Sequence, residues 1–171
     1  MFASKRLALL LAPCLLLVFL STRAALIWDL AVICLALLDA FLAPKPLELR
    51  VERENGPTVR LGQPSSSRIT ITNTAKRAMR GSLHDAWVPS AGASDNFYQF
   101  NLGPGERRRF TTPLQPKRRG KRRADYATVR SLGPLGLAGR QRSLVAPAHV
   151  QVLPPFNSRK HLPSRLNLLR E

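Results

Sequence analysis

Residues 7–43 form an almost continuous apolar segment of 37 residues, interrupted at Ser21-Thr22-Arg23. A single helix of that length would extend about 55 Å, because each residue adds about 1.5 Å. The hydrocarbon core of a bilayer is only about 30 Å thick, so two spans, 7–22 and 24–43, fit better than one. The segment therefore predicts a transmembrane helical hairpin within residues 1–45.

The basic residues around this segment predict its orientation. They flank the outer ends of the hairpin, and only Arg23 lies between the two spans; the flanking cations are Lys5, Arg6, Lys45, Arg50 and Arg53. By the positive-inside rule both ends face the cytoplasm. We therefore expect a multi-pass protein of the cell membrane, with its soluble part in the cytoplasm. The competing interpretation is a cleaved signal peptide followed by one anchor.

Two acidic residues, Asp29 and Asp39, lie inside the second predicted span. Acids within a membrane are costly and are candidates for function. Each lies about five residues from an end of the span, near the level of the headgroups. We therefore expect interfacial acids, or a packing contact with Arg23 or with a partner helix.

After Pro44-Lys45-Pro46 the hydrophobic pattern has period two, which is typical of strands with one buried face. About eight short strands are expected, at Leu47–Glu52, Val59–Leu61, Arg68–Asn73, Leu83–Val88, Phe97–Leu102, Arg107–Leu114, Asp125–Leu132 and His149–Leu153. Turn signals separate them, such as Gly103-Pro104-Gly105-Glu106. Residues 46–155 therefore predict an all-β immunoglobulin-like sandwich.

Residues 156–171 have a different character and predict a linker and the start of a helix near Ser164, a suitable N-cap. The chain ends while Leu166, Leu168 and Leu169 are still in a pattern suited to packing. We expect this helix to lead into a further domain that is missing here.

The sequence contains no recognisable catalytic chemistry. It lacks a phosphate-binding loop, a Gly-x-Ser-x-Gly elbow and a His-Glu-x-x-His motif. Both cysteines, Cys14 and Cys34, lie in the apolar segment, which leaves no thiol nucleophile or zinc set in the soluble part. His84 and Asp85 are neighbours that would point to opposite faces of a strand. We therefore expect no enzymatic activity, no cofactor and no metal site.

The formal net charge is +17, and the densest run of cations is a candidate contact surface. It comprises Lys117, Arg118, Arg119, Lys121, Arg122 and Arg123. Such a run can be a charged connection between strands, or a contact for anionic lipid headgroups or an acidic partner. Nucleic acid is the least favoured ligand, because only Tyr126 lies nearby for base stacking.

An ordered set of short motifs resembles a bacterial family. The apolar segment ends in Leu-Leu-Asp-Ala-Phe-Leu-Ala, and the β-region contains Leu-Gly-Pro-Gly-Glu, Lys-Arg-Arg-Gly, Tyr126, Val-Arg-Ser, Pro-Leu-Gly-Leu and Val-Leu-Pro-Pro. Together these resemble the N-terminal half of the family called domain of unknown function 58. One departure is Gly133, which stands where the family usually has an Asp before Pro-Leu-Gly-Leu. The stretch between Gly120 and Tyr126 is also longer than the family's usual spacing.

The resemblance implies a membrane-anchored protein with an adaptor or assembly role. Members are often encoded beside MoxR-type AAA+ ATPases, which makes such an ATPase the expected partner. The family normally continues into a von Willebrand factor A-like domain, and the motif that leads into that domain is not present in this sequence.

Overall fold

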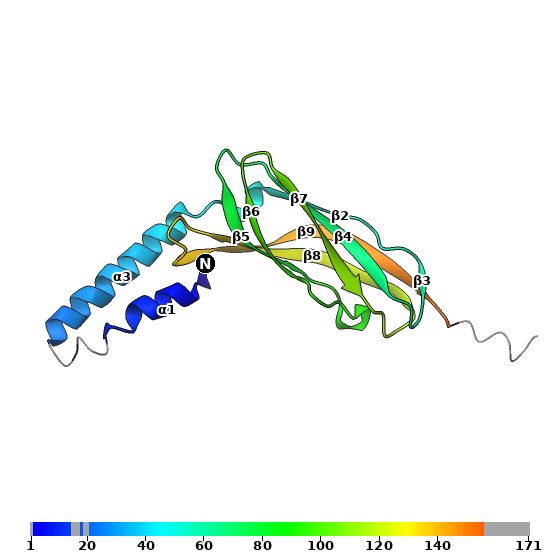
Figure 1. Ribbon diagram of the computed structural model, residues 1–171, viewed down its shortest axis with the longest axis horizontal. Coiled ribbons are helices and arrows are strands. Elements are labelled where there is room, and N and C mark those ends of the chain that lie inside the picture. Colours follow the sequence, from blue (N-terminus) through cyan, green and yellow to red (C-terminus); the bar gives the residue numbers. More distant parts are fainter. Residues whose placement is uncertain (1, 15–17, 19–20, 156–171) are drawn as a thin grey trace, which may run out of the picture.

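The computed structural model describes residues 2–14, 18 and 21–155 of the 171-residue chain (Figure 1). The described helices α1 (Lys5–Leu11) and α3 (Thr22–Leu42) lie on one side of a β-sandwich, and the sandwich extends away from them at an angle. The helix predicted to begin near Ser164 lies outside the described residues.

Helix α3 (Thr22–Leu42) agrees closely with the predicted span 24–43. Its 21 residues give a length of about 31 Å, close to the thickness of a bilayer core. Many of its apolar side chains are exposed, and Pro44 follows its end because proline cannot continue the hydrogen-bond pattern. Among the described helices, α3 alone is long and apolar enough to cross a membrane, and a signal sequence near the N-terminus would meet the same criteria.

Helix α1 (Lys5–Leu11) is much shorter than the predicted span 7–22. The Ser4 side chain caps its start by accepting a hydrogen bond from the Arg6 N–H at 3.2 Å. The helix ends two residues before Pro13, which disrupts helical hydrogen bonding. Residues 15–17 and 19–20 of the predicted span lie outside the described part of the chain. A first membrane crossing, and with it the hairpin, therefore stays a prediction.

The predicted β-sandwich is confirmed, and each predicted strand has a counterpart. In chain order the strands are β1 (Phe2–Ala3), β2 (Leu49–Arg53), β3 (Val59–Arg60), β4 (Ser65–Asn73), β5 (Met79–Asp85), β6 (Phe97–Leu102), β7 (Arg107–Leu114), β8 (Gly120–Leu132) and β9 (Ala138–Leu153). Short 3₁₀ turns occur at Pro46–Glu48 and Pro89–Ala91. One sheet has the order β1-β9-β8-β5-β6, with β3 parallel to β9, and the other has the order β2-β4-β7.

Two strands are much longer than their sequence patterns predicted. Strand β8 begins at Gly120 instead of Asp125, and β9 begins at Ala138 instead of His149. They pair with each other along almost their whole length, with a register shift between Ala124 and Tyr126. This long ribbon reaches from the helices to the far end of the sandwich (Figure 1).

The core lies between the two sheets. Its larger members are fully or almost fully buried and come from both sheets: Leu49, Ile69, Ile71, Met79, Leu83, Phe100, Leu102 and Val129. A second cluster fills the half of the sandwich farther from the helices and contains Trp87, Leu114, Val150 and Val152. The alternation of buried and exposed residues along β4 and β5 follows from this packing.

A buried ion pair connects the two sheets. The Arg53 guanidinium contacts the Asp85 carboxylate, and neither side chain is exposed to solvent. Asp85 also accepts hydrogen bonds from Trp87 Nε1 at 3.0 Å and from Thr112 Oγ1 at 2.6 Å. Arg53 was counted among the cations that flank the membrane segment in the sequence. In the fold its charge is paired inside the sandwich.

Candidate functional site: the junction between helix and sandwich

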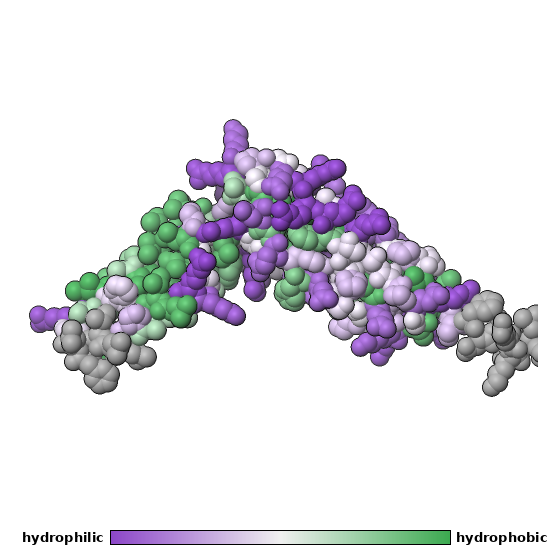
Figure 2. Space-filling model, in the orientation of Figure 1, coloured by the Kyte–Doolittle hydropathy of each residue, from purple (hydrophilic) through white to green (hydrophobic). Residues whose placement is uncertain are grey.

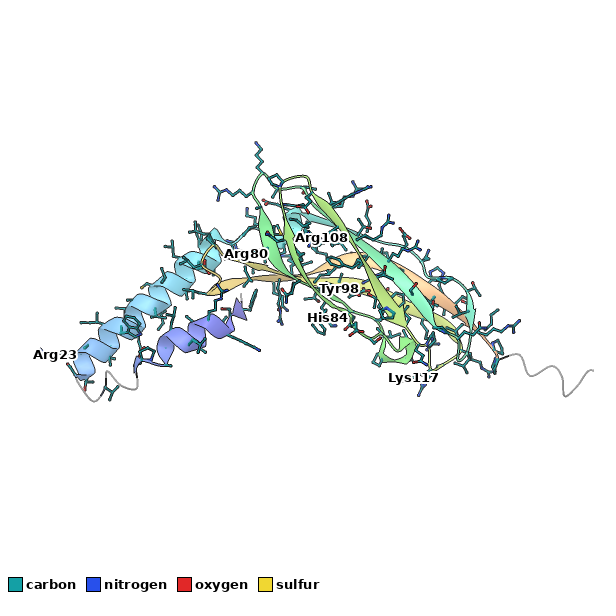
Figure 3. The ribbon with its side chains drawn as sticks, in the orientation of Figure 1. Arg23, Arg80, His84, Tyr98, Arg108 and Lys117 are labelled. Carbon is teal, nitrogen blue, oxygen red and sulfur yellow. The ribbon has the colours of Figure 1, made fainter. Side chains whose placement is uncertain are left out.

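Asp39, in the last turn of α3, binds the turn between β8 and β9. Its side chain is almost completely buried and accepts hydrogen bonds from three backbone N–H groups. Leu135 N–H donates to Oδ1 at 2.8 Å, while Leu137 and Ala138 donate to Oδ2 at 2.7 and 3.0 Å. The expected contact with Arg23 is therefore not made by Asp39, which binds the β8–β9 turn instead, while its place at the membrane interface stays a prediction. Arg23 lies at the opposite end of α3 (Figure 3).

Gly133 leaves the space that the Asp39 carboxylate occupies. A Cβ atom at position 133 would lie closer than 3.0 Å to both the backbone oxygen and the side chain of Asp39. The turn is completed by hydrogen bonds from Gly136 N to Gly133 O and from Gly133 N to Ala138 O. A residue with a side chain at position 133 would collide with α3, so the position of Asp39 requires a glycine there.

Side chains of the β-ribbon also satisfy carbonyl groups at the end of α3. Arg140 donates to Ala40 O at 3.2 Å and to Phe41 O at 3.0 Å. Ser131 Oγ donates to Pro44 O at 2.6 Å. The last carbonyls of a helix have no partner within the helix, and a cation there also complements the helix dipole. The C-terminus of α3 is therefore held by the sandwich.

The N-terminal residues bind the same turn from another side. Strand β1 (Phe2–Ala3) pairs antiparallel with the start of β9. Ser4 then donates from its backbone N to Leu137 O at 2.8 Å and from its hydroxyl to Gly136 O at 2.6 Å. The segment before α1 and the end of α3 are thus both attached to the β8–β9 turn.

Asp29 is not part of this junction. It lies in the N-terminal half of α3, where it accepts a hydrogen bond from Cys14 Sγ at 3.0 Å. Next to it, Trp28 Nε1 donates to Leu10 O at 2.9 Å. These contacts connect α3 to the segment around α1. The two acids of the predicted span therefore have separate structural environments.

The six-cation cluster does not form a single surface. Lys117, Arg118 and Arg119 are exposed in the loop before β8, and Figure 3 places Lys117 at the end of the sandwich away from the helices. Arg122 is half-buried and donates to Ser90 Oγ at 3.1 Å and to Arg119 O at 2.9 Å. Lys121 and Arg123 instead line a shallow hollow that also contains His149. Half of the cluster therefore belongs to a strand.

Other cations gather around the junction. A hollow of about 720 Å³ beside the end of α3 is lined by four of them, Lys45, Lys76, Arg77 and Arg140. A second hollow, of about 500 Å³, contains Lys5, Arg6 and Arg80. Sequence reasoning missed this grouping because the residues come from distant segments and form no run. The sequence signals at the junction were the intramembrane acid Asp39 and the departure from the family motif at Gly133.

The other polar residues considered in the sequence make structural contacts. Asp85 faces the core, whereas the His84 ring stacks on Phe97 at 4.0 Å between centroids, so the two neighbours do point to opposite sides. Burial raises the pKa of the Tyr98 hydroxyl, which bonds to Thr111 O and Thr112 Oγ1. Among the described residues, no group of three or more His, Cys, Asp or Glu side chains could hold a metal ion.

Comparison with known proteins gives structural neighbours only. No family model matches the chain, and no curated protein does. The chain is similar to the ASH/PapD-like domain of human CEP192 (14% identity, 66% of this chain and 91% of that one, TM-score 0.42). It is also similar to the CARDB domain of PF1109 from Pyrococcus furiosus (18% identity, 67% of this chain and 91% of that one, TM-score 0.41). A protein of unknown function from Porphyromonas gingivalis W83 is a third neighbour (15% identity, 65% of this chain and 50% of that one, TM-score 0.47).

Proposed function

We propose that the chain is a membrane-anchored interaction protein without enzymatic activity. A helical hairpin holds it in the cell membrane, and the β-sandwich faces the cytoplasm. The proposed partner is a MoxR-type AAA+ ATPase, which the family resemblance implies.

The junction at Asp39 is the observation that carries this proposal. An anchor that only tethers a domain needs no buried contacts with it, and a flexible linker would be sufficient. Here the end of α3 is bound by three backbone N–H groups and by Arg140. The anchor therefore fixes the direction in which the sandwich is presented, as a protein that docks a large partner at the membrane requires.

The distribution of cations supports the cytoplasmic placement. Lys5 and Arg6 in the first turn of α1, and Lys45 after α3, lie at the end of the helices that meets the sandwich. Figure 2 shows apolar residues covering the helices and hydrophilic ones covering much of the sandwich. The positive-inside rule associates such a basic end with the cytoplasm.

Protease protection tests the placement. In inverted membrane vesicles, added protease should digest the sandwich, and in intact spheroplasts the sandwich should be protected. The reverse pattern of protection would rule out a cytoplasmic sandwich.

Co-purification tests the partner. The full chain, extracted from membranes in mild detergent, should retain the MoxR-type ATPase of the same organism. The Asp39→Asn variant should retain less, and Asp29→Asn should serve as the matched control. Absence of the ATPase from preparations of the unmodified chain would refute this partner.

Binding of anionic lipid headgroups by the six-cation cluster remains the alternative. The exposure of Lys117, Arg118 and Arg119 favours some contact with an anion. However, these residues lie at the end of the sandwich away from α3, and Arg122 is engaged with Ser90. Steeply salt-dependent binding to anionic liposomes, lost on charge reversal of the three loop cations, would support the alternative.

A further inference from the structure

We propose that the hollow between the end of α3 and the β4–β5 loop binds the headgroup of an anionic phospholipid. This inference rests on the proposed membrane insertion of α3. The hollow has a volume of about 720 Å³, and its walls include Lys45, Lys76, Arg77, Arg140 and Phe41. It is separate from the six-cation cluster of the sequence.

The charge of the hollow favours an anion. Four cations line it, against one carboxylate, Glu48. In the described part of the chain, the ion pairs formed by carboxylates involve none of these four cations. Arg140 is directed to helix carbonyls, while Lys45, Lys76 and Arg77 are exposed and available to a phosphate group. Lys45 comes from the connection between α3 and β2, and Lys76 and Arg77 come from the connection between β4 and β5. The hollow therefore has positive charge on two sides.

The position of the hollow favours a lipid over a soluble anion. It lies at the end of a helix about as long as the bilayer core is thick, which is the depth of the headgroups. Phe41 and Leu42 form its apolar side and are 72% and 46% exposed. A phosphodiester carrying acyl chains matches both sides, because its charge would meet the cations and its chains would lie against these apolar residues.

The expected contribution of each cation is measurable. A Lys or Arg near an anionic membrane surface strengthens binding about fivefold. Removal of three cations, in Lys45→Gln/Lys76→Gln/Arg77→Gln, should therefore weaken lipid binding about a hundredfold. The pair Lys76→Gln/Arg77→Gln should weaken it about 25-fold. All three side chains are exposed, so the fold should be retained.

Native mass spectrometry of the full chain in detergent tests the proposal, with titrations of phosphatidylglycerol and of phosphatidylcholine. The unmodified chain should bind phosphatidylglycerol more tightly, and both variants should lose this preference. The matched control is Lys117→Gln/Arg118→Gln/Arg119→Gln, which removes equal charge at the other end of the sandwich and should bind like the unmodified chain.

Three results would overturn the proposal. Equal weakening in the control and the triple variant would mean that only overall charge matters, and unchanged binding in the triple variant would exclude the hollow. Competition by glycerol phosphate at the concentration effective for the lipid would assign the site to soluble phosphates. Because the assay uses neither an ATPase nor a sealed membrane, its outcome is independent of the partner and of the placement of the sandwich.

Discussion

Asp39→Asn should release the β8–β9 turn from the end of α3 while leaving the size of the side chain almost unchanged. An amide has one accepting oxygen and one donating NH₂ group, whereas the carboxylate accepts on both oxygens. With the asparagine oxygen facing Leu137 and Ala138, its NH₂ group would face the Leu135 N–H. One partly buried donor would thus lose its acceptor, and two hydrogen bonds would lose their charge.

The magnitude follows from these three contacts. An orphaned buried donor costs about 1–3 kcal/mol, and hydrogen bonds to charged groups are stronger than neutral ones by about 1 kcal/mol. The junction should therefore lose about 3 kcal/mol. Since about 1.4 kcal/mol corresponds to a factor of ten, opening of the turn should become about a hundredfold more frequent.

Hydrogen exchange of the full chain in detergent measures this opening. The amides of Leu135, Leu137 and Ala138 should exchange about a hundredfold faster in Asp39→Asn. Asp29→Asn makes the same chemical change on the same helix, but Asp29 accepts its hydrogen bond from Cys14 Sγ and not from the β8–β9 turn. It should leave these amides unchanged. Unchanged exchange in Asp39→Asn itself would refute the role of the carboxylate.

Three further substitutions test the fold around this site. Gly133→Ala should destabilise the junction by about 1–3 kcal/mol, because its methyl group collides with Asp39; this would appear as faster exchange of the turn amides. Asp85→Asn leaves the buried Arg53 charge without its partner and should lower the free energy of unfolding by about 3–5 kcal/mol, measured by denaturant titration in detergent. Burial raises the pKa of Tyr98 in the folded state. Above pH of about 10 the tyrosine of the unfolded chain loses its proton more readily than the folded one, so the stability of the fold should fall as pH rises towards the folded-state pKa. In thermal unfolding, Tyr98→Phe should lose less stability above pH of about 10 than the unmodified chain does. An equal loss in both would mean that Tyr98 does not cause the fall in stability.

Much of the architecture followed from local periodicity. The alternation in residues 68–73, 97–102 and 107–114 identified β4, β6 and β7, because those strands bury one face against the other sheet. The long apolar segment identified α3 to within two residues at its start. These features depend on neighbours close in sequence, so sequence patterns could predict them.

The junction depended on contacts distant in sequence. The donors to Asp39 lie between 96 and 99 residues away, and no local pattern indicates them. Strand β8 was predicted too short because its first residues are mostly cations, although pairing with β9 continues to Gly120. Arg53 was counted with the flanking cations because it follows the apolar segment in sequence, and its buried partner Asp85 lies on another strand, 32 residues away.

A distance measurement by pulsed electron paramagnetic resonance tests the central claim most directly. Spin labels would replace the exposed Ile27 on α3 and Lys117 at the far end of the sandwich, in a full chain with Cys14→Ser and Cys34→Ser, in lipid nanodiscs. If the junction joins helix and sandwich into one body, the label-to-label distance distribution should be narrow, and Asp39→Asn should broaden it. A broad distribution in the chain that retains Asp39, unchanged by the substitution, would contradict the account.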